Sequence, residues 1–214
     1  MNTHPTIVIG DVHGLTFWEK VVEENPEGRY IFLGDYLDPY ENMSTCHLIN
    51  NLKKIINLKK ERKDDVILLL GNHDIHYLNF EIKPCWRFDE TIKDAAHTLF
   101  SENIHLFMYA FQEGNRLFTH AGISQRWFLE DFKGDIEKNI AKQINNPKHD
   151  QISALDSGEG FFWVRKYELI DPLPGYTQFV GHTRVDKIIK HTANNGEVTY
   201  CDCLYNEKYL ILDH

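Results

Sequence analysis

The chain has 214 residues, of which 42% are hydrophobic, and its formal net charge is −9 with histidine neutral. This length suits one large domain, which we expect to span residues 1–214, and the hydrophobic fraction is sufficient for a sizeable core. The negative charge argues against a duplex nucleic-acid partner, because proteins that bind nucleic acid usually carry a basic surface. A compact anionic substrate is compatible with this charge if divalent cations reverse the potential locally.

The sequence shows no secretory or membrane signal. Its N-terminus runs directly into the short apolar segment Thr6–Ile9, without a basic region or a long apolar stretch before it. The four cysteines lack the paired spacing of a zinc site. Cys201 and Cys203 alternate along an expected strand, so we expect two half-buried thiols on one face, with a metal or redox pair as the less favoured alternative. We therefore expect a cytoplasmic protein without a membrane partner.

The first half of the chain alternates short apolar strands with helices. Buried strands are predicted at Thr6–Ile9, Tyr30–Leu33 and Val66–Leu70 from their length and their β-branched residues. Thr16, with Glu19 three residues later, has the capping-box pattern of a helix start.

Two further helix starts are expected. Ser44 or Thr45 is predicted to cap a long helix with an apolar face. Asp74 is expected to cap the helix that follows the third strand, in preference to a catalytic role.

The second half of the chain consists mainly of short strands. Helices are expected at Gln125–Phe132 and Asp135–Ile144, and Asn145–Gly160 has the composition of a long loop. Strands are predicted at Leu106–Phe111, Arg116–Thr119, Thr177–Val180, Lys187–Thr192, Glu197–Cys203 and Tyr209–Leu212.

Five short segments place Asp, Asn or His on glycine-containing turns. Divalent ions such as Mn²⁺, Fe²⁺ and Zn²⁺ accept mixed oxygen and imidazole ligands, and a shared carboxylate can hold two of them about 3.5–4 Å apart. Three of the segments directly follow expected strands, and ligands of open α/β sheets bind at the carboxyl ends of strands. The segments are GDVHG at 10–14, GDYLD at 34–38, GNHD at 71–74, THAG at 119–122 and GHT at 181–183.

Together and in this order, these segments resemble the calcineurin-like metallophosphoesterase superfamily. The resemblance is strongest to its PPP-type branch, which includes bacterial and phage serine/threonine phosphatases and symmetrical diadenosine tetraphosphatases. Any one segment alone is a weak signal, whereas five ordered matches between residues 10 and 183 are a strong one. The resemblance implies an α/β fold, a four-layer α/β/β/α sandwich of two mixed β-sheets flanked by helices, with the metal site at the strand ends.

The resemblance also implies a role for each matching residue. Two divalent ions are expected, Mn²⁺ in the first place, with Fe or Zn²⁺ as alternatives. His73 would protonate the leaving group, oriented by Asp38, because a carboxylate on one ring nitrogen holds the tautomer and stabilises the cationic form. The implied metal ligands are Asp11 and His13 on the first ion, Asp35 as the bridge, and Asn72, His120 and His182 on the second ion.

The match departs from the family at one place. The family has Asp-Arg-Gly where this chain has Asp38–Tyr40, so an arginine that grips the substrate phosphate is missing. Arg165, which resembles a phosphate-contacting arginine of the bacterial members, is expected to be the remaining clamp. Asn72 is expected to contact substrate as well as metal, and Arg184 and Arg87 are candidate substitutes for the missing arginine.

Other notable side chains are expected to be structural. His76 is expected on the surface, and Trp86, like the aromatic residues at 161–163, in the core or the pocket wall. Tyr36 and Tyr40 are candidates to line the mouth of the substrate site. The remaining histidines are expected to be structural or exposed, namely His4, His47, His97, His105, His149, His191 and His214.

The expected function is a metal-dependent phosphatase. A metal-bridging hydroxide would attack phosphorus in line, and His73 would act as general acid on a phosphoprotein or small phosphomonoester. Hydrolysis of a dinucleoside polyphosphate such as diadenosine tetraphosphate, or of a phosphodiester, is the alternative. A catalytically silent binding protein on the same fold is less favoured, because packing requires no such set of ligand residues.

Overall fold

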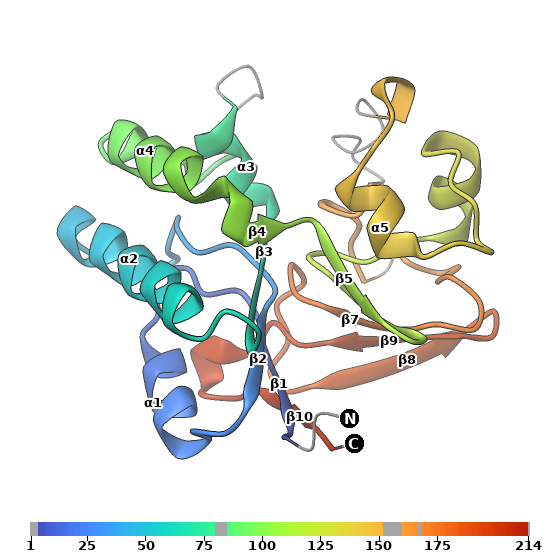
Figure 1. The fold of residues 1–214 in the computed structure, drawn as a ribbon, viewed down its shortest axis with the longest axis horizontal. Helices are drawn as coiled ribbons and strands as arrows, with labels where there is room; N and C mark the ends of the chain where they lie inside the picture. The colour runs from blue at the N-terminus through green and yellow to red at the C-terminus, as the bar shows by residue number, and fades with distance from the viewer. Residues whose placement is uncertain (1–3, 80–84, 152–159, 167, 214) are drawn as a thin grey trace.

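The computed structural model describes residues 4–79, 85–151, 160–166 and 168–213. Within these residues the strands form two five-stranded mixed sheets (Figure 1). The first sheet has the order β10-β1-β2-β3-β4, in which β1 to β4 run parallel and β10 pairs antiparallel with β1. Its strands are β1 (Thr6–Ile9), β2 (Arg29–Phe32), β3 (Val66–Leu69), β4 (Phe107–Met108) and β10 (Leu210–Leu212).

The second sheet has the order β5-β6-β7-β9-β8. Its three central strands are parallel, and β5 and β8 are antiparallel strands at the two edges. The predicted strand Leu106–Phe111 is divided between the two sheets, because Asn145 Oδ1 accepts hydrogen bonds from the backbone of Tyr109 and Ala110 where the chain passes from one sheet to the other. The strands are β5 (Ala110–Glu113), β6 (Arg116–Thr119), β7 (Thr177–Val180), β8 (Ile189–Ala193) and β9 (Gly196–Tyr200).

The two sheets pack face to face. Ile7 and Ile9 of β1 belong to the core beneath the helices, whereas Val8 points the other way and packs in a cluster between the sheets. Phe118 and Phe179 of the second sheet stack in that cluster, with ring centroids 4.8 Å apart. This period-two alternation confirms the predicted sandwich of two mixed sheets flanked by helices.

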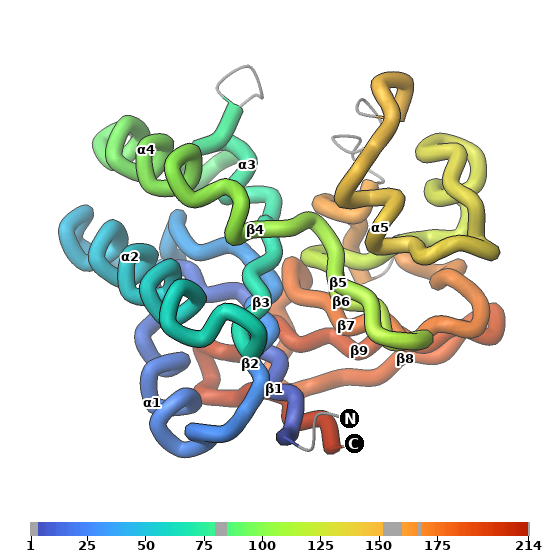
Figure 2. Tube along the Cα trace, in the orientation of Figure 1, coloured from blue at the N-terminus to red at the C-terminus, as the bar shows by residue number. Residues whose placement is uncertain are grey.

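Helices lie on the outer sides of this pair of sheets. Figure 2 shows α1 and α2 beside the first sheet, and α5 beside β5 of the second. In the part of the chain that the structure describes, no helix is both long and apolar enough to cross a membrane. The helices are α1 (Phe17–Glu24), α2 (Thr45–Glu61), α3 (Asn72–Leu78), α4 (Lys93–Asn103) and α5 (Ile140–Asn145).

The first two predicted helices begin where expected, but only one of them has the expected side-chain cap. Ser44 caps α2, its Oγ accepting a hydrogen bond from the backbone nitrogen of His47 at 3.2 Å. Thr16 is the N-cap residue of α1, as predicted, but its side chain makes no capping hydrogen bond, so the predicted capping box is wrong. Glu19 instead forms an ion pair with Lys54 of α2 at 2.9 Å, and this contact between helices replaces the local one.

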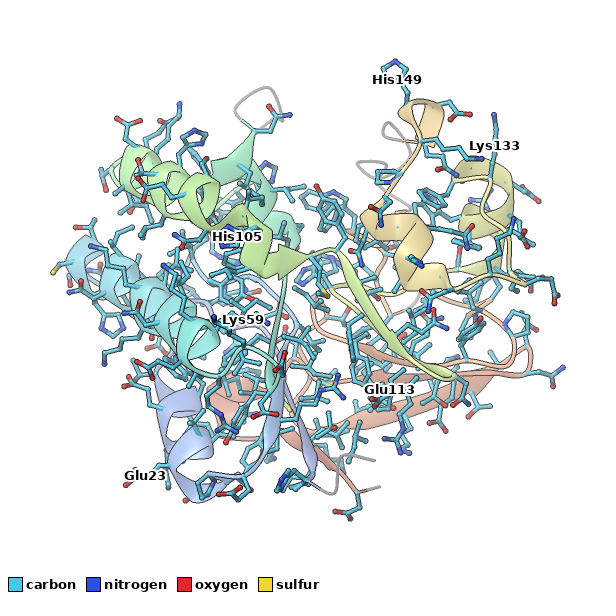
Figure 3. All side chains as sticks on the ribbon, viewed as in Figure 1. Glu23, Lys59, His105, Glu113, Lys133 and His149 are labelled. Atoms are coloured by element: carbon cyan, nitrogen blue, oxygen red, sulfur yellow. The ribbon has the colours of Figure 1, made fainter. Side chains whose placement is uncertain are left out.

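The predicted helices of the second half are shorter than expected. Gln125–Phe132 contains a π-helical segment at Trp127–Asp131, and α5 begins only after Asn139, whose side chain accepts from Lys142 at 2.7 Å. Of the expected loop Asn145–Gly160, residues 152–159 lie outside the described residues. The exposed side chains of Lys133, before α5, and of His149, after it, project outward (Figure 3).

The expectation for Cys201 and Cys203 is wrong. Strand β9 ends at Tyr200, and the backbone then turns, with the nitrogen of Cys203 donating to the carbonyl of Cys201 at 2.8 Å. The two thiols are therefore buried in different clusters, Cys201 between the sheets and Cys203 with Val180 on the far side of the second sheet.

Candidate metal centre and active site

The candidate ligands lie on loops that leave the carboxyl ends of strands. Asp11 follows β1, Asp35 follows β2 and Asn72 follows β3. Parallel strands present their carboxyl ends at one edge of a sheet, so these loops meet, and the loops after β6 and β7 meet them from the second sheet. All six predicted ligands are at most 5% exposed, namely Asp11, His13, Asp35, Asn72, His120 and His182.

The six side chains form two groups that share Asp35. Oδ2 of Asp35 lies 3.6 Å from Nε2 of His13 and 3.5 Å from Nε2 of His120, so it faces both groups at once. Asp11 completes the first group, its Oδ2 3.8 Å from Nε2 of His13. In the second group, Oδ1 of Asn72 lies 2.8 Å from Nε2 of His120 and 2.9 Å from Nδ1 of His182.

The three histidines of this cluster are each held by a backbone carbonyl. The nitrogen that donates to the carbonyl carries the proton, so the other nitrogen points its lone pair into the cluster, as in metal-binding histidines. Acceptor atoms thus converge on a buried point, an arrangement that a cation satisfies. The donor bonds are His13 Nδ1 to Leu37 at 2.7 Å, His120 Nδ1 to Leu33 at 2.8 Å and His182 Nε2 to Trp163 at 3.1 Å.

Electrostatics also fit a cation. Burial raises the pKa of Asp11 well above its usual value, and the nearby carboxylate of Asp202 raises it further. Burial and the carboxylate of Asp74 likewise raise the pKa of Asp35. Burial lowers the pKa of His120 to about 3, so the ring is neutral. Crowded carboxylates and neutral imidazoles in a dry site are a donor set that divalent ions such as Mn²⁺, Fe²⁺ and Zn²⁺ accept.

Two motif glycines let the loops approach each other. A Cβ atom on Gly71 would lie 2.2 Å from Oδ1 of Asp35, and one on Gly181 would lie 2.1 Å from Oδ1 of Asp11. The same carboxylate oxygens accept backbone hydrogen bonds at 2.9 Å from His73 and His182, the second residue after Gly71 and the first after Gly181. These glycines are therefore needed for loop-to-loop packing at the centre.

Four site residues have strained backbones. His13, Asp35, Asp38 and His182 have φ angles of 42°, 52°, 57° and 58°, in the left-handed region that non-glycine residues rarely adopt. Each such residue costs on the order of 1–3 kcal/mol and persists only where its surroundings hold it. Strain of this kind is typical of sites where side-chain direction matters more than local stability.

His73 differs from the three histidines of the cluster. Its Nδ1 donates to Oδ2 of Asp38 at 2.7 Å, and Asp38 is fully buried, with Oδ1 accepting from the hydroxyl of Tyr77 at 2.5 Å. Burial and the charge of Arg87 lower the pKa of His73 to about 3, and burial raises that of Asp38 to about 6. A carboxylate, and not a backbone carbonyl, therefore fixes the orientation and the tautomer of this ring.

Arg87 occupies the edge of the cluster next to His73. Its Nη2 lies 3.2 Å from Nε2 of His73 and 3.4 Å from Nε2 of His13, and its Nε donates to the carbonyl of Asp38 at 2.9 Å. The guanidinium lies 3.6 Å over the ring of Tyr40. No local motif marks Arg87, and the sequence ranked it below Arg165.

The other two candidate arginines lie further out. Nη1 of Arg165 donates to the carbonyl of His182 at 3.1 Å, and its charge lowers the pKa of His182, after the larger effects of burial and His120. Arg184 is stacked between Tyr205, 3.5 Å from its ring centroid, and Tyr40, at 4.6 Å. Arg184 also lines a pocket that opens beside Asp11 and His13, with Tyr40, Asp202 and Tyr205 on its walls.

Two acidic residues support the centre. Asp74 caps α3 as expected, and its carboxylate also accepts from the backbone of Asp35 at 2.8 Å and of Tyr36 at 3.0 Å, which holds the Asp35 loop in place. Asp202, buried beside Asp11, was not foreseen, because the only pattern in that stretch of sequence is the spacing of the flanking cysteines. Its pKa is raised to about 6 by burial.

Three expectations about neighbouring side chains are wrong. Tyr36 is fully buried and donates to the carbonyl of Leu69 at 2.9 Å, so it does not line a mouth. His76 lies on the inward face of α3 and is buried beside Trp163, with ring centroids 5.9 Å apart. Trp86 is 96% exposed, because the turn that directs Arg87 inward leaves its neighbour outside. Tyr40 is half-exposed in the pocket wall, as anticipated.

Comparison with known proteins shows which family has this arrangement of motifs. A family model described as Calcineurin-like phosphoesterase matches residues 4–207. The chain belongs to this family. The family is one of phosphoric ester hydrolases that use divalent metals, and the structure supplies candidate residues to hold such ions.

Relatives of this phosphoesterase include protein phosphatases. A protein phosphatase 2A catalytic chain of Dictyostelium discoideum is 33% identical over 75 residues, which are 33% of this chain and 22% of the relative. The chain spans less than a quarter of the curated relatives it matches.

Two solved structures share the fold. The cold-active protein-tyrosine phosphatase of a psychrophilic Shewanella species has a TM-score of 0.67 at 17% identity, covering 99% of this chain and 76% of that one. A protein serine/threonine phosphatase from Saccharomyces cerevisiae has a TM-score of 0.57 at 15% identity, covering 94% and 68%.

Proposed function

We propose that this phosphoesterase hydrolyses phosphomonoesters with two bound divalent ions. The observation that carries the proposal is the pairing of a carboxylate-held histidine, His73 on Asp38, with an adjacent cluster of buried side chains that could hold metal ions. Neither packing nor folding needs this combination. Asp11 and His13 would hold the first ion, Asn72, His120 and His182 would hold the second, and Asp35 would be shared between them.

Manganese is the proposed native metal, with Fe or Zn²⁺ as alternatives, because the six side chains offer oxygen and imidazole donors without sulfur. When bound, such ions supply the Lewis acidity that activates water and stabilises charge on the phosphoryl group. The four free cysteines are compatible with a reducing compartment, and we retain the cytoplasm as the proposed location.

His73 is the proposed general acid. Its Nε2 is the nitrogen that faces the cluster, and Asp38 holds the opposite nitrogen, so a proton on Nε2 would point toward the leaving group. In the resting site, burial and Arg87 keep the ring neutral. A phosphate dianion attracts Arg87 and favours the cationic ring, so substrate binding itself would promote protonation of His73.

Arg87 and Arg165 are the proposed phosphate clamp, together with the amide of Asn72. Arg87 already points at His73 and His13, and Arg165 reaches the carbonyl of His182, so the two guanidinium groups approach the cluster from different loops. Pro39 stands where the family has its arginine. The ring of Tyr40, the next residue, packs against the guanidinium of Arg87. We propose that Arg87 takes over the function of the missing arginine.

A phosphorylated protein or a small phosphomonoester is the proposed substrate. The named relatives are protein phosphatases, one for serine and threonine residues and one for tyrosine. The pocket beside Asp11 has aromatic walls from Tyr40 and Tyr205, with the charge of Arg184 between them. Such a pocket would accept the part of the substrate next to the phosphate, including an aromatic one.

The test is turnover of a substrate panel by the metal-loaded protein. With added Mn²⁺ we expect p-nitrophenyl phosphate and phosphopeptides to be hydrolysed faster than a bis-aryl phosphodiester. The Asp35→Asn variant is the control, because it should lose both the bound metal and all turnover. Preferential hydrolysis of diadenosine tetraphosphate would replace the proposal with the polyphosphate alternative, and metal binding without any turnover would indicate a silent binding protein.

A further inference from the structure

Cys85 lies directly against the proposed proton donor. Its Sγ is 3.0 Å from Nδ1 of His73 and 3.6 Å from Oδ2 of Asp38, and those two atoms are 2.7 Å apart. A sulfur, an imidazole nitrogen and a carboxylate oxygen therefore converge on one point, and these are the three donor types that bind Zn²⁺ in proteins. This group shares no residue with the six-residue metal centre.

We propose that Cys85, His73 and Asp38 form a separate binding site for a thiophilic divalent cation, Zn²⁺ in the first place, and that its occupancy inhibits catalysis. Binding at this site is independent of the proposed function. Only the inhibition rests on the proposed role of His73 as proton donor.

The geometry needs little adjustment. With bonds of about 2.3 Å to sulfur and about 2.0–2.2 Å to nitrogen and oxygen, the donors of a tetrahedral Zn²⁺ lie about 3.3–3.6 Å apart. The sulfur-to-oxygen distance of 3.6 Å already agrees. The distances from Nδ1 to the sulfur and to the carboxylate oxygen, 3.0 and 2.7 Å, would open by about 0.5 and about 0.7 Å. Asp38 is fixed by Tyr77, whereas Cys85 is only half-buried, so an ion could enter beside Cys85 and keep water as a fourth ligand.

Charge favours a metal over an oxidation switch at this position. Burial, with Asp38 beside it, raises the pKa of the Cys85 thiol to about 12. Oxidants react with thiolates, so the thiol is unreactive as it stands. A divalent ion supplies the positive charge that lets Cys85 ionise beside the Asp38 carboxylate. The guanidinium of Arg87 faces the other ring nitrogen of His73, so its charge does not stand between the three donor atoms.

Occupancy would disable His73 in two ways. Metal on Nδ1 takes the place of the hydrogen bond to Asp38 that orients the ring. It also leaves the imidazole neutral with its proton on Nε2. Donation of that proton would leave an imidazolate, and the neutral ring is a far weaker acid than the cationic ring. The six-residue centre would keep its own ions throughout.

The proposal is tested with Cd²⁺ as an optical probe. A thiolate bound to Cd²⁺ gives an ultraviolet charge-transfer band, whereas the sulfur-free six-residue centre is silent when it takes up the same ion. We expect a saturable band in the wild-type protein, reversed by Zn²⁺, and retained in Cys46→Ser, which removes an exposed thiol. The band should be absent in Cys85→Ser. No band in the wild type, or a band that persists in Cys85→Ser, would overturn the site.

Activity tests the inhibitory half. In Mn²⁺-loaded protein, the Zn²⁺ concentration that gives half inhibition should rise by about 10–100-fold in Cys85→Ser, because even the loss of a residue that only supports a metal ligand weakens metal binding to that extent. The same concentration should be unchanged in Cys46→Ser. A Cys85-dependent band without inhibition supports the site and overturns its link to catalysis.

A measurement without the Cys85 variant covers the case in which Cys85→Ser does not fold. Zinc X-ray absorption of Cys46→Ser should show a sulfur neighbour at about 2.3 Å. Its absence would overturn the proposal.

Discussion

The guanidinium of Arg87 lies 3.6 Å over the ring of Tyr40. We propose that this contact compensates for the arginine that the family pattern has and this chain lacks. Pro39 removes an arginine from the loop after β2, but the next residue supplies an aromatic surface on which an arginine from a distant segment rests beside His73. A stacked guanidinium loses less freedom when it binds phosphate, because its plane is already oriented.

Arg87→Ala should weaken binding of phosphate and of vanadate by about 10–100-fold, the range expected for hydrogen bonds to a charged group worth about 1.5–3 kcal/mol. The number of bound metal ions should not change. Arg87→Lys should recover only part of the loss, because a point charge cannot reproduce the planar fork. Arg116→Ala is the matched control, since Arg116 contacts the carbonyl of Asp213 away from the site. If Arg87→Ala binds phosphate with wild-type affinity, the role of phosphate clamp would be assigned to Arg165 alone.

His73→Asn should slow turnover by ~10²–10⁴-fold, the usual contribution of a positioned general acid. The loss should be smaller for p-nitrophenyl phosphate than for an alkyl phosphate, because a good leaving group needs less protonation. The Mn²⁺ content, measured by elemental analysis, should remain near the wild-type value, since His73 belongs to neither group of the six-residue centre. Equal losses on both substrates would assign His73 to binding instead.

Tyr77→Phe should move the acid limb of the pH profile. The Tyr77 hydroxyl donates to Asp38 and lowers its pKa against the effect of burial, which raises that pKa to about 6. Without this hydrogen bond the pKa of Asp38 rises further, so the carboxylate that holds His73 is lost at a higher pH as the solution is acidified. We expect the acid limb of kcat/KM to shift upward in pH, whereas Tyr200→Phe, whose hydroxyl faces Lys166, should leave it in place. A downward shift would contradict this account.

Gly181→Ala should abolish metal binding at the group that contains Asp11. Its effect on the stability of the fold should be smaller. The added Cβ would lie 2.1 Å from Oδ1 of Asp11, so the carboxylate or the His182 loop must move. Gly175→Ala is the matched control, because its Cβ meets open space and its positive φ of 80° costs only about 1–2 kcal/mol of strain. Isothermal titration with Mn²⁺ and thermal unfolding separate the two effects. Normal Mn²⁺ affinity in Gly181→Ala would show that the loop contact is not needed.

Much of the sheet framework and the candidate ligand set could be predicted from the sequence. Thr6–Ile9, Arg116–Thr119 and Thr177–Val180 have the predicted bounds, because a short apolar run between turn residues is a local signal. The motif loops follow strands, and parallel strands bring their carboxyl ends together, so the convergence of Asp11, Asp35 and the other candidate ligands follows from order along the chain.

Only the tertiary structure decided what surrounds those ligands. Arg87 and Cys85 contact Asp38 from almost fifty positions along the chain, and Asp202 reaches Asp11 from the opposite end. A turn that no sequence motif marks leaves Trp86 exposed and directs Arg87 inward. Strand periodicity and turn chemistry act over a few residues, whereas these contacts depend on how separate loops pack against one another. No single segment of the sequence determines that packing.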